Sequence, residues 1–134
     1  MAAKITCNIS VQMVGGPAIT DSLTMMVDAV DVIDSVVVPK QTAGEAISVQ
    51  PGGAKQVQFL LIKTSKWGDQ LSYSVDAAQP DETKRIKLDK SLQVFLGTGS
   101  VGLYGQDPKT FFFYNDFDQD VTITIFVGRK ATVS

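Results

Sequence analysis

Apolar and polar residues alternate with a period of two along much of this chain, and no segment shows the three-to-four-residue apolar spacing of an amphipathic helix. The alternation is clearest in residues 4–13, KITCNISVQM, where every second side chain from Ile5 to Met13 is apolar. Successive side chains of a strand point to opposite faces of a sheet, so this pattern is typical of strands that are buried on one face. The sequence therefore predicts an all-β protein.

Further segments rich in alternating or β-branched residues predict additional strands, bounded by turn-forming residues. In the last of them every second residue from Val121 to Val127 is apolar and shares one face. About eight to ten strands favour one domain over residues 1–134, an antiparallel β-sandwich of jelly-roll or immunoglobulin-like type, with a closed β-barrel as the alternative. Besides residues 4–13, we expect strands at about 20–29, 32–39, 46–50, 57–62, 71–77, 85–97 (one or two strands), 110–115 and 120–128.

The composition excludes several kinds of partner. The chain has 134 residues, a net charge of −2 and 19% charged residues, so it offers no basic surface for nucleic acid. Its most basic segment, residues 83–90, is interrupted by Asp89, and we interpret it as a solvated strand edge. No apolar run is long enough for a signal peptide or a membrane-spanning helix, and Cys7, the single cysteine, cannot form an internal disulfide. We therefore expect cytoplasmic synthesis and no membrane partner.

The absence of histidine narrows the possible chemistry most. Serine and cysteine nucleophile systems use an imidazole base, and common zinc sites combine histidine with cysteine, so neither can form here. Residues 97–102, GTGSVG, match the spacing of the dinucleotide fingerprint, but Gly105 and Pro108 follow too soon for the required helix. We expect a glycine-rich turn there, and we predict no enzyme and no cofactor. A site made of aspartates alone, as in glycosidases, is the catalytic alternative left open.

Three aspartates at alternate positions, Asp116, Asp118 and Asp120, raise the question of a calcium site. Calcium takes six to eight oxygen ligands, and an EF-hand also needs a glycine and a glutamate where this chain has Val121 and Val127. We predict no metal in an EF-hand and interpret the segment as a hairpin turn between two strands. A looser calcium site, completed by other loops, stays open.

Three aromatic residues in loops are candidate interaction residues: Trp67 in SKWGDQ, Tyr104 in the glycine-rich loop, and Phe117 among the aspartates. Loop aromatics can anchor a protein interface, stack on a sugar ring or cap the end of a sandwich. A lectin-like, carbohydrate-binding module is therefore the alternative function. Its platform would consist of Trp67, Tyr73, Tyr104 and Tyr114.

The low charge, the length and the succession of strands from residues 4–13 to residues 120–134 resemble the small all-β accessory proteins of tailed-bacteriophage virions, such as capsid cement, neck and tail subunits. The resemblance implies a non-catalytic structural protein that works through protein–protein contacts, as a homo-oligomer or within a larger assembly such as a virion. The contact surfaces would then be the loops at 65–70, 97–108 and 115–120. The tails at 1–4 and 129–134 would act as arms.

Overall fold

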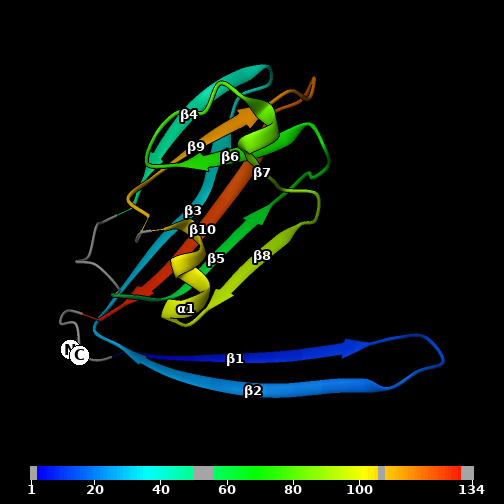
Figure 1. The fold of residues 1–134 in the computed structure, drawn as a ribbon, viewed down its shortest axis with the longest axis vertical. Helices are drawn as coiled ribbons and strands as arrows, with labels where there is room; N and C mark the ends of the chain where they lie inside the picture. The colour runs from blue at the N-terminus through cyan, green and yellow to red at the C-terminus, as the bar shows by residue number, and fades with distance from the viewer. Residues whose placement is uncertain (1–2, 50–55, 106–107, 131–134) are drawn as a thin grey trace.

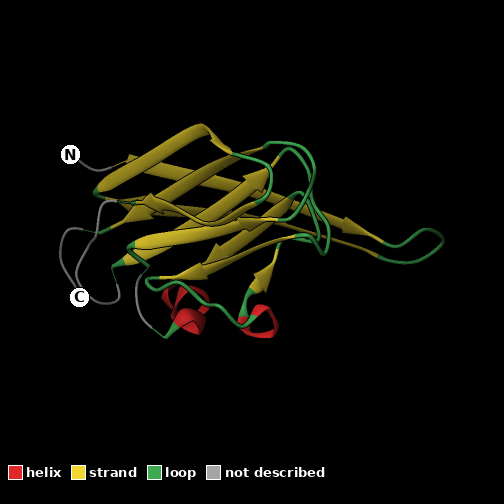
Figure 2. Ribbon diagram, turned by 90° about the horizontal axis from the view of Figure 1, so that it is seen from above, coloured by secondary structure: helices red, strands yellow, loops and turns green. Residues whose placement is uncertain are grey.

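The protein is built of antiparallel strands arranged as a sandwich with a projecting two-stranded ribbon (Figures 1 and 2). The computed structural model of the chain describes residues 3–49, 56–105 and 108–130. Sheet 1 has the strand order β3 (Ala29–Val38), β10 (Val121–Arg129), β5 (Val57–Thr64) and β8 (Leu92–Leu96). Sheet 2 has the order β4 (Thr42–Ser48), β9 (Thr110–Asn115), β6 (Leu71–Val75) and β7 (Ile86–Lys87). The ribbon consists of β1 (Ala3–Gln12) and β2 (Ala18–Val27).

The inner faces of the two sheets form the main core. Along β10 the residues from Val121 to Val127 alternate as predicted, and the four apolar ones at odd positions are almost completely buried. Sheet 2 contributes aromatic side chains to the same core, including Tyr73, Phe111 and Phe113. The predicted all-β, sandwich-like fold is confirmed, and no sheet closes into a barrel within the described residues.

One strand begins earlier than its sequence pattern indicated. We expected a strand at 46–50, whereas β4 starts at Thr42 and pairs with β9 along its length. The pairing register shifts between Ala43 and Glu45, where Gly44 has a φ of 91°. Such a bulge interrupts the period-two alternation, so the pattern became recognisable only from Ala46 onward.

The segment at 115–120 is not the hairpin turn that we predicted. It joins β9 to β10, which belong to different sheets, so the chain crosses here from sheet 2 to sheet 1. The glycine-rich segment also differs from expectation, because it contains a single helical turn, α1 (Thr98–Val101), followed by the 3₁₀ turn η2 (Gly102–Tyr104). The basic segment at 83–90 contains the end of the 3₁₀ turn η1 (Glu82–Lys84) and all of β7, which lies at the edge of sheet 2 as predicted.

Candidate protein-interaction site

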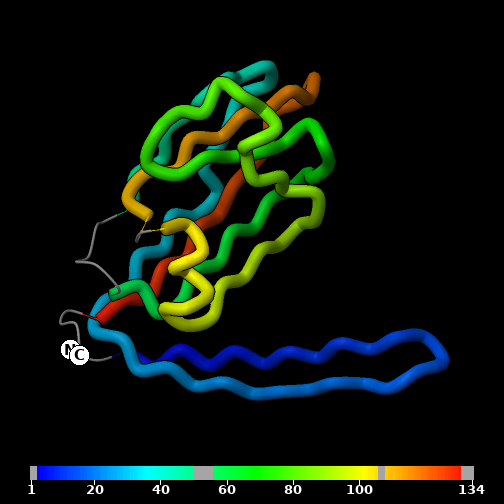
Figure 3. Tube along the Cα trace, in the orientation of Figure 1, coloured from blue at the N-terminus to red at the C-terminus, as the bar shows by residue number. Residues whose placement is uncertain are grey.

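The ribbon of β1 and β2, here called the arm (residues 3–27), leaves the sandwich and extends past it (Figures 1 and 3). Its pairing runs from Ala3 opposite Val27 to Gln12 opposite Ala18 with no register shift. At the strand rise of about 3.3 Å per residue, ten residues give the arm a length of roughly 30 Å. A tight turn closes the far end, where the Gly16 amide donates a 2.9 Å hydrogen bond to the Met13 carbonyl.

The arm has one apolar face and one mostly polar face. Residues directly opposite each other share a face, so the register places a single charged residue, Asp21, on the apolar side. The other members of the apolar face are Ala3, Ile5, Cys7, Ile9 and Val11 of β1 and Ile19, Leu23, Met25 and Val27 of β2. The opposite face is made largely of threonine, serine, asparagine and glutamine, which suits contact with water.

The base of the arm is anchored on the outer face of sheet 1. Ile5, Val27 and Phe59 are buried together there, as the centre of a second, smaller core. A Cβ atom at Gly128 of β10 would lie only 2.5 Å from Cδ1 of Ile5 and 3.4 Å from Cγ1 of Val27. The glycine therefore leaves the space that Ile5 occupies. Beside this contact the Asp28 amide donates a 2.9 Å hydrogen bond to the Arg129 carbonyl.

The same apolar face continues along the distal half of the arm, the half next to the turn between Gln12 and Ala18. There the described part of the chain leaves it exposed. Val11 is 60% exposed and Ile19, directly opposite, is 70% exposed. Val14, in the turn, is fully exposed as well. A two-stranded ribbon is only marginally stable by itself, and contiguous exposed apolar surface commonly marks an interaction site. The distal half of the arm is therefore the strongest candidate for a protein interface.

A second apolar surface lies on the outer face of sheet 1, next to the anchored base of the arm. Val32 of β3 and Leu92 of β8 are about half exposed there, and Val37 of β3 is too. Between them run Phe126 of β10 and Leu61 of β5, which are partly covered by the arm. The arm thus covers one end of this sheet face and leaves the other end open.

Of the three residues predicted to contact a partner, Trp67 is the most exposed, with 48% of its area accessible. Phe117 is 7% exposed and packs in the main core, with its ring edge under Gly68, so the expected surface contact at Phe117 is wrong. The sequence placed it at the tip of a hairpin, whereas the crossing between sheets turns its side chain inward. Tyr104 is half-buried and packs edge-on or tilted against Phe95 and Phe111.

The four aromatic residues proposed as a sugar platform do not form one. Tyr73 is completely buried, and Tyr114 is 4% exposed. The guanidinium carbon of Arg85 lies 3.7 Å from the centre of the Tyr114 ring, and the Tyr114 hydroxyl accepts a 2.7 Å hydrogen bond from the Gln79 amide. Tyr73 and Tyr114 therefore serve packing, and Trp67 is the most exposed of the four rings.

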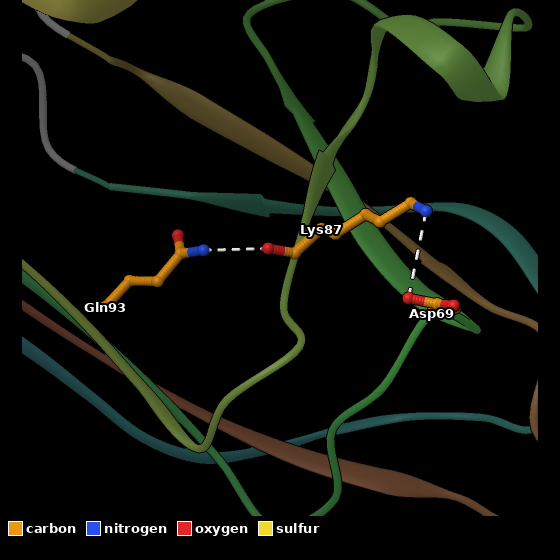
Figure 4. A network of polar contacts seen from close by, with 3 residues as sticks. All are labelled: Asp69, Lys87 and Gln93. Carbon is orange, nitrogen blue, oxygen red and sulfur yellow. Dashed lines mark hydrogen bonds and ion pairs between the residues drawn. The ribbon is translucent and has the colours of Figure 1, made fainter.

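A polar network connects the two sheets through the buried tyrosines. The Tyr73 hydroxyl donates to Oε1 of Gln93 at 2.8 Å and lies 2.7 Å from the Tyr104 hydroxyl. Nε2 of Gln93 donates to the Lys87 carbonyl at 2.8 Å, and the Lys87 ammonium lies 3.8 Å from the Asp69 carboxylate (Figure 4). Burial raises the pKa of Tyr73 to about 12, and burial together with the neighbouring Tyr73 raises the pKa of Tyr104. Both phenols are therefore neutral near pH 7 and act as structural hydrogen-bonding groups.

The three aspartates hold the crossing loop in place. Oδ1 of Asp120 accepts a 2.9 Å hydrogen bond from the Lys40 amide, and Oδ1 of Asp118 accepts one of 3.2 Å from Nε2 of Gln41. The backbone amide of Asp116 donates to the Gln70 carbonyl at 2.9 Å. Within the described residues, no group of three or more histidine, cysteine, aspartate or glutamate side chains could hold a metal ion.

Sequence reasoning missed the arm as a site. It predicted both strands, but their alternation is the same as that of strands inside the sandwich. The tails that it proposed as arms lie partly outside the described residues, at 1–2 and 131–134, and Ala3 and Lys4 belong to β1. In the part of the chain that is described, no helix has the length and apolar character needed to cross a membrane.

Comparison with protein-family models, with curated proteins and with solved structures gives no match for this chain. The geometry of the arm and of sheet 1 is therefore the ground for a functional proposal.

Proposed function

We propose that the protein is a non-catalytic structural subunit that assembles with copies of itself through the arm. The observation that carries this proposal is the uncovered apolar face of the distal arm, with Val11 and Ile19 both more than half exposed. Burying one such side chain fully stabilises a complex by about 1.5–3 kcal/mol. A ribbon that keeps these residues in water is therefore best explained by a partner that covers them.

The strand pairing supports a jelly roll as the type of sandwich. The eight strands of the two sheets pair in a nested way, β3 with β10, β4 with β9, β5 with β8 and β6 with β7. This is the pattern of one long hairpin rolled into two four-stranded sheets, as expected of a jelly roll. An immunoglobulin-like domain would instead have sheets of four and three strands in its basic form.

A role as an accessory subunit of a bacteriophage virion, in a capsid, neck or tail, fits this proposal. Jelly rolls are common among viral capsid proteins, and a projecting arm suits a subunit whose neighbours repeat at fixed positions. The role in a virion is supported by analogy of fold, whereas self-assembly is supported by the exposed apolar face of the arm.

A lectin-like module is the second candidate function, and the exposure of Trp67 in the loop at 65–70 favours it. Jelly rolls also include lectin domains. A glycan array distinguishes the two candidates. Sugar binding that is lost on Trp67→Ala supports the lectin, whereas the assembly proposal expects no sugar binding.

Light scattering after size exclusion tests the assembly proposal directly. We expect the wild-type chain to elute as an oligomer and the double variant Val11→Thr/Ile19→Thr to dissociate at least tenfold more readily, since each 1.4 kcal/mol of lost contact is tenfold in Kd. Threonine keeps the β-branched shape that a strand prefers, so the arm itself should persist. Met26→Thr, at an exposed position on the opposite face, is the matched control and should leave the oligomer intact. A wild-type chain that stays monomeric up to millimolar concentration contradicts the proposal.

A further inference from the structure

We propose that the distal apolar face of the arm packs on the open part of the outer face of sheet 1 in a second copy of this chain. The contact is head-to-tail, so every copy donates its arm to one neighbour and receives an arm from another. The inference rests on the proposed function, self-assembly through the arm, and specifies which surface receives it.

The first argument is that the contact already exists within one chain. The base of the arm packs its apolar face against Phe59, Leu61 and Phe126, so the outer face of sheet 1 accepts a ribbon laid across its strands. The open part of the same face carries aliphatic side chains on its two edge strands, Val37 of β3 and Leu92 of β8, with Thr122, Thr124 and Lys63 on the strands between them. A neighbour's distal arm would there meet both aliphatic and polar side chains.

The second argument is that the arm cannot cover this surface on its own chain. Ile5 is fixed over Gly128, and the ribbon runs on from there without a bulge that could turn it back. The distal half extends beyond β8, the last strand of sheet 1, as Figures 1 and 3 show. Within one chain, the distal apolar face of the arm and the open part of the outer face of sheet 1 therefore both stay exposed and cannot contact each other. A second copy of the chain would cover both.

The third argument is charge complementarity. Asp21 is the one charged residue on the apolar face of the arm, and covering it would be costly without a cation. Lys63 is exposed on β5, next to Leu92 in the sheet, within the open surface. The ion pairs found among the described residues join side chains other than Asp21 and Lys63. Oδ1 of Asp21 accepts a 2.8 Å hydrogen bond from the neighbouring Ser22 amide, and a carboxylate can accept further bonds from a cation. Asp34 is a carboxylate on the outer face of sheet 1. It already accepts a hydrogen bond from Thr124 of its own chain, so we do not take it as the partner of Lys63.

Two other ways of pairing arms explain less. Edge-to-edge pairing of two arms into a four-stranded sheet would leave both apolar faces in water. Stacking two arms face to face would bury Asp21 with no cation, because the apolar face contains no basic residue. In both cases the outer face of sheet 1, with Val32 and Leu92, would stay open.

A charge swap tests the pairing. Asp21→Lys and Lys63→Asp should each weaken self-association by about fivefold or more, because each single variant places two like charges where the wild type has an ion pair. The double variant Asp21→Lys/Lys63→Asp should return to within about twofold of the wild-type dissociation constant, since the pair is restored with its signs exchanged. Glu82→Lys, at an exposed site in η1 outside both surfaces, is the control for a change in net charge.

Crosslinking gives an independent reading in a Cys7→Ser background, where each chain carries one introduced thiol. A short bismaleimide should join Asp21→Cys chains to Lys63→Cys chains when the two are mixed. Asn8→Cys, on the opposite face of the arm, should not react with Lys63→Cys.

The outcomes separate this inference from the proposed function. An oligomeric wild type in which the charge-swapped double variant is no better than the single variants overturns the head-to-tail contact and leaves self-assembly standing. Efficient crosslinking of Asp21→Cys chains to each other also overturns it, in favour of stacked arms. A monomeric wild type removes both proposals.

Discussion

The anchoring of the arm depends on a glycine, and replacing it should have an effect that a second substitution reverses. The Cβ atom of alanine at position 128 would lie 2.5 Å from Cδ1 of Ile5, where carbon atoms in contact normally keep about 3.5–4.0 Å. Ile5 is buried against Phe59 and cannot swing freely into solvent. Gly128→Ala therefore forces the arm outward or Ile5 out of its preferred rotamer.

The magnitude follows from two opposing contributions. Overpacking of this kind costs about 1–3 kcal/mol. Alanine gains back about 0.4–1 kcal/mol because it restricts the unfolded chain more than glycine does, and the φ angle at position 128 is not of the kind that requires glycine. We expect Gly128→Ala to lower the free energy of unfolding by about 1–2 kcal/mol.

Ile5→Val removes the one atom that clashes and by itself should cost about 0.5–1.5 kcal/mol. In that background Gly128→Ala should be neutral or stabilising, so the double variant should be about as stable as Ile5→Val alone. Urea denaturation at one fixed protein concentration, followed by circular dichroism, gives the four free energies of the cycle, because self-association would otherwise shift apparent stability. If the two effects simply add, to within about 0.5 kcal/mol, Ile5 does not lie over Gly128 and the arm is not anchored as described.

Three other predictions concern the sandwich itself. Asn115→Ala should lower the free energy of unfolding by about 3 kcal/mol or more in urea denaturation. The Asn115 side chain is buried, and the substitution would leave the Phe117 amide and the carbonyls of Val38 and Gln119 without this partner. A loss below about 1 kcal/mol would contradict that network. Phe117→Ala should cost about 3 kcal/mol in the same assay and leave the oligomeric state unchanged, as expected of a core residue. Stability should fall from pH 10 towards pH 12, because the unfolded state releases the Tyr73 proton near pH 10 and the folded state holds it to about 12. A tyrosinate absorbance titration of the folded protein in which all three tyrosines ionise near pH 10 would refute this.

The local alternation of side chains was enough to predict most of the strands. The period of two in residues 4–13 and 120–128 depends only on backbone geometry, and β1 and β10 lie within one residue of the predicted bounds. The pattern failed where the backbone leaves that geometry. At Gly44 a bulge interrupts the alternation, so the pattern did not indicate that β4 begins at Thr42. At 98–104 the chain forms short helical turns that the pattern did not predict.

The same alternation could not predict the candidate site. Alternation indicates that one face of a strand avoids water, and it carries no information about which surface covers that face. Ile5 and Val11 occupy equivalent positions in the sequence pattern, yet one is 8% and the other 60% exposed. Phe117 shows the converse, since a lone aromatic residue among aspartates is buried by a loop that crosses between the sheets.

Residue types and near-neighbour patterns are enough to establish that this chain forms strands, which side chains share a face, and that these residues cannot form a catalytic site with an imidazole base. Only the folded chain shows that the first two strands stand outside the sandwich, that the aspartates hold a crossing loop, and that Trp67 is exposed while Tyr73 and Phe117 are buried. Those outcomes depend on contacts between residues far apart in the chain, such as the pairing of β3 with β10 in sheet 1.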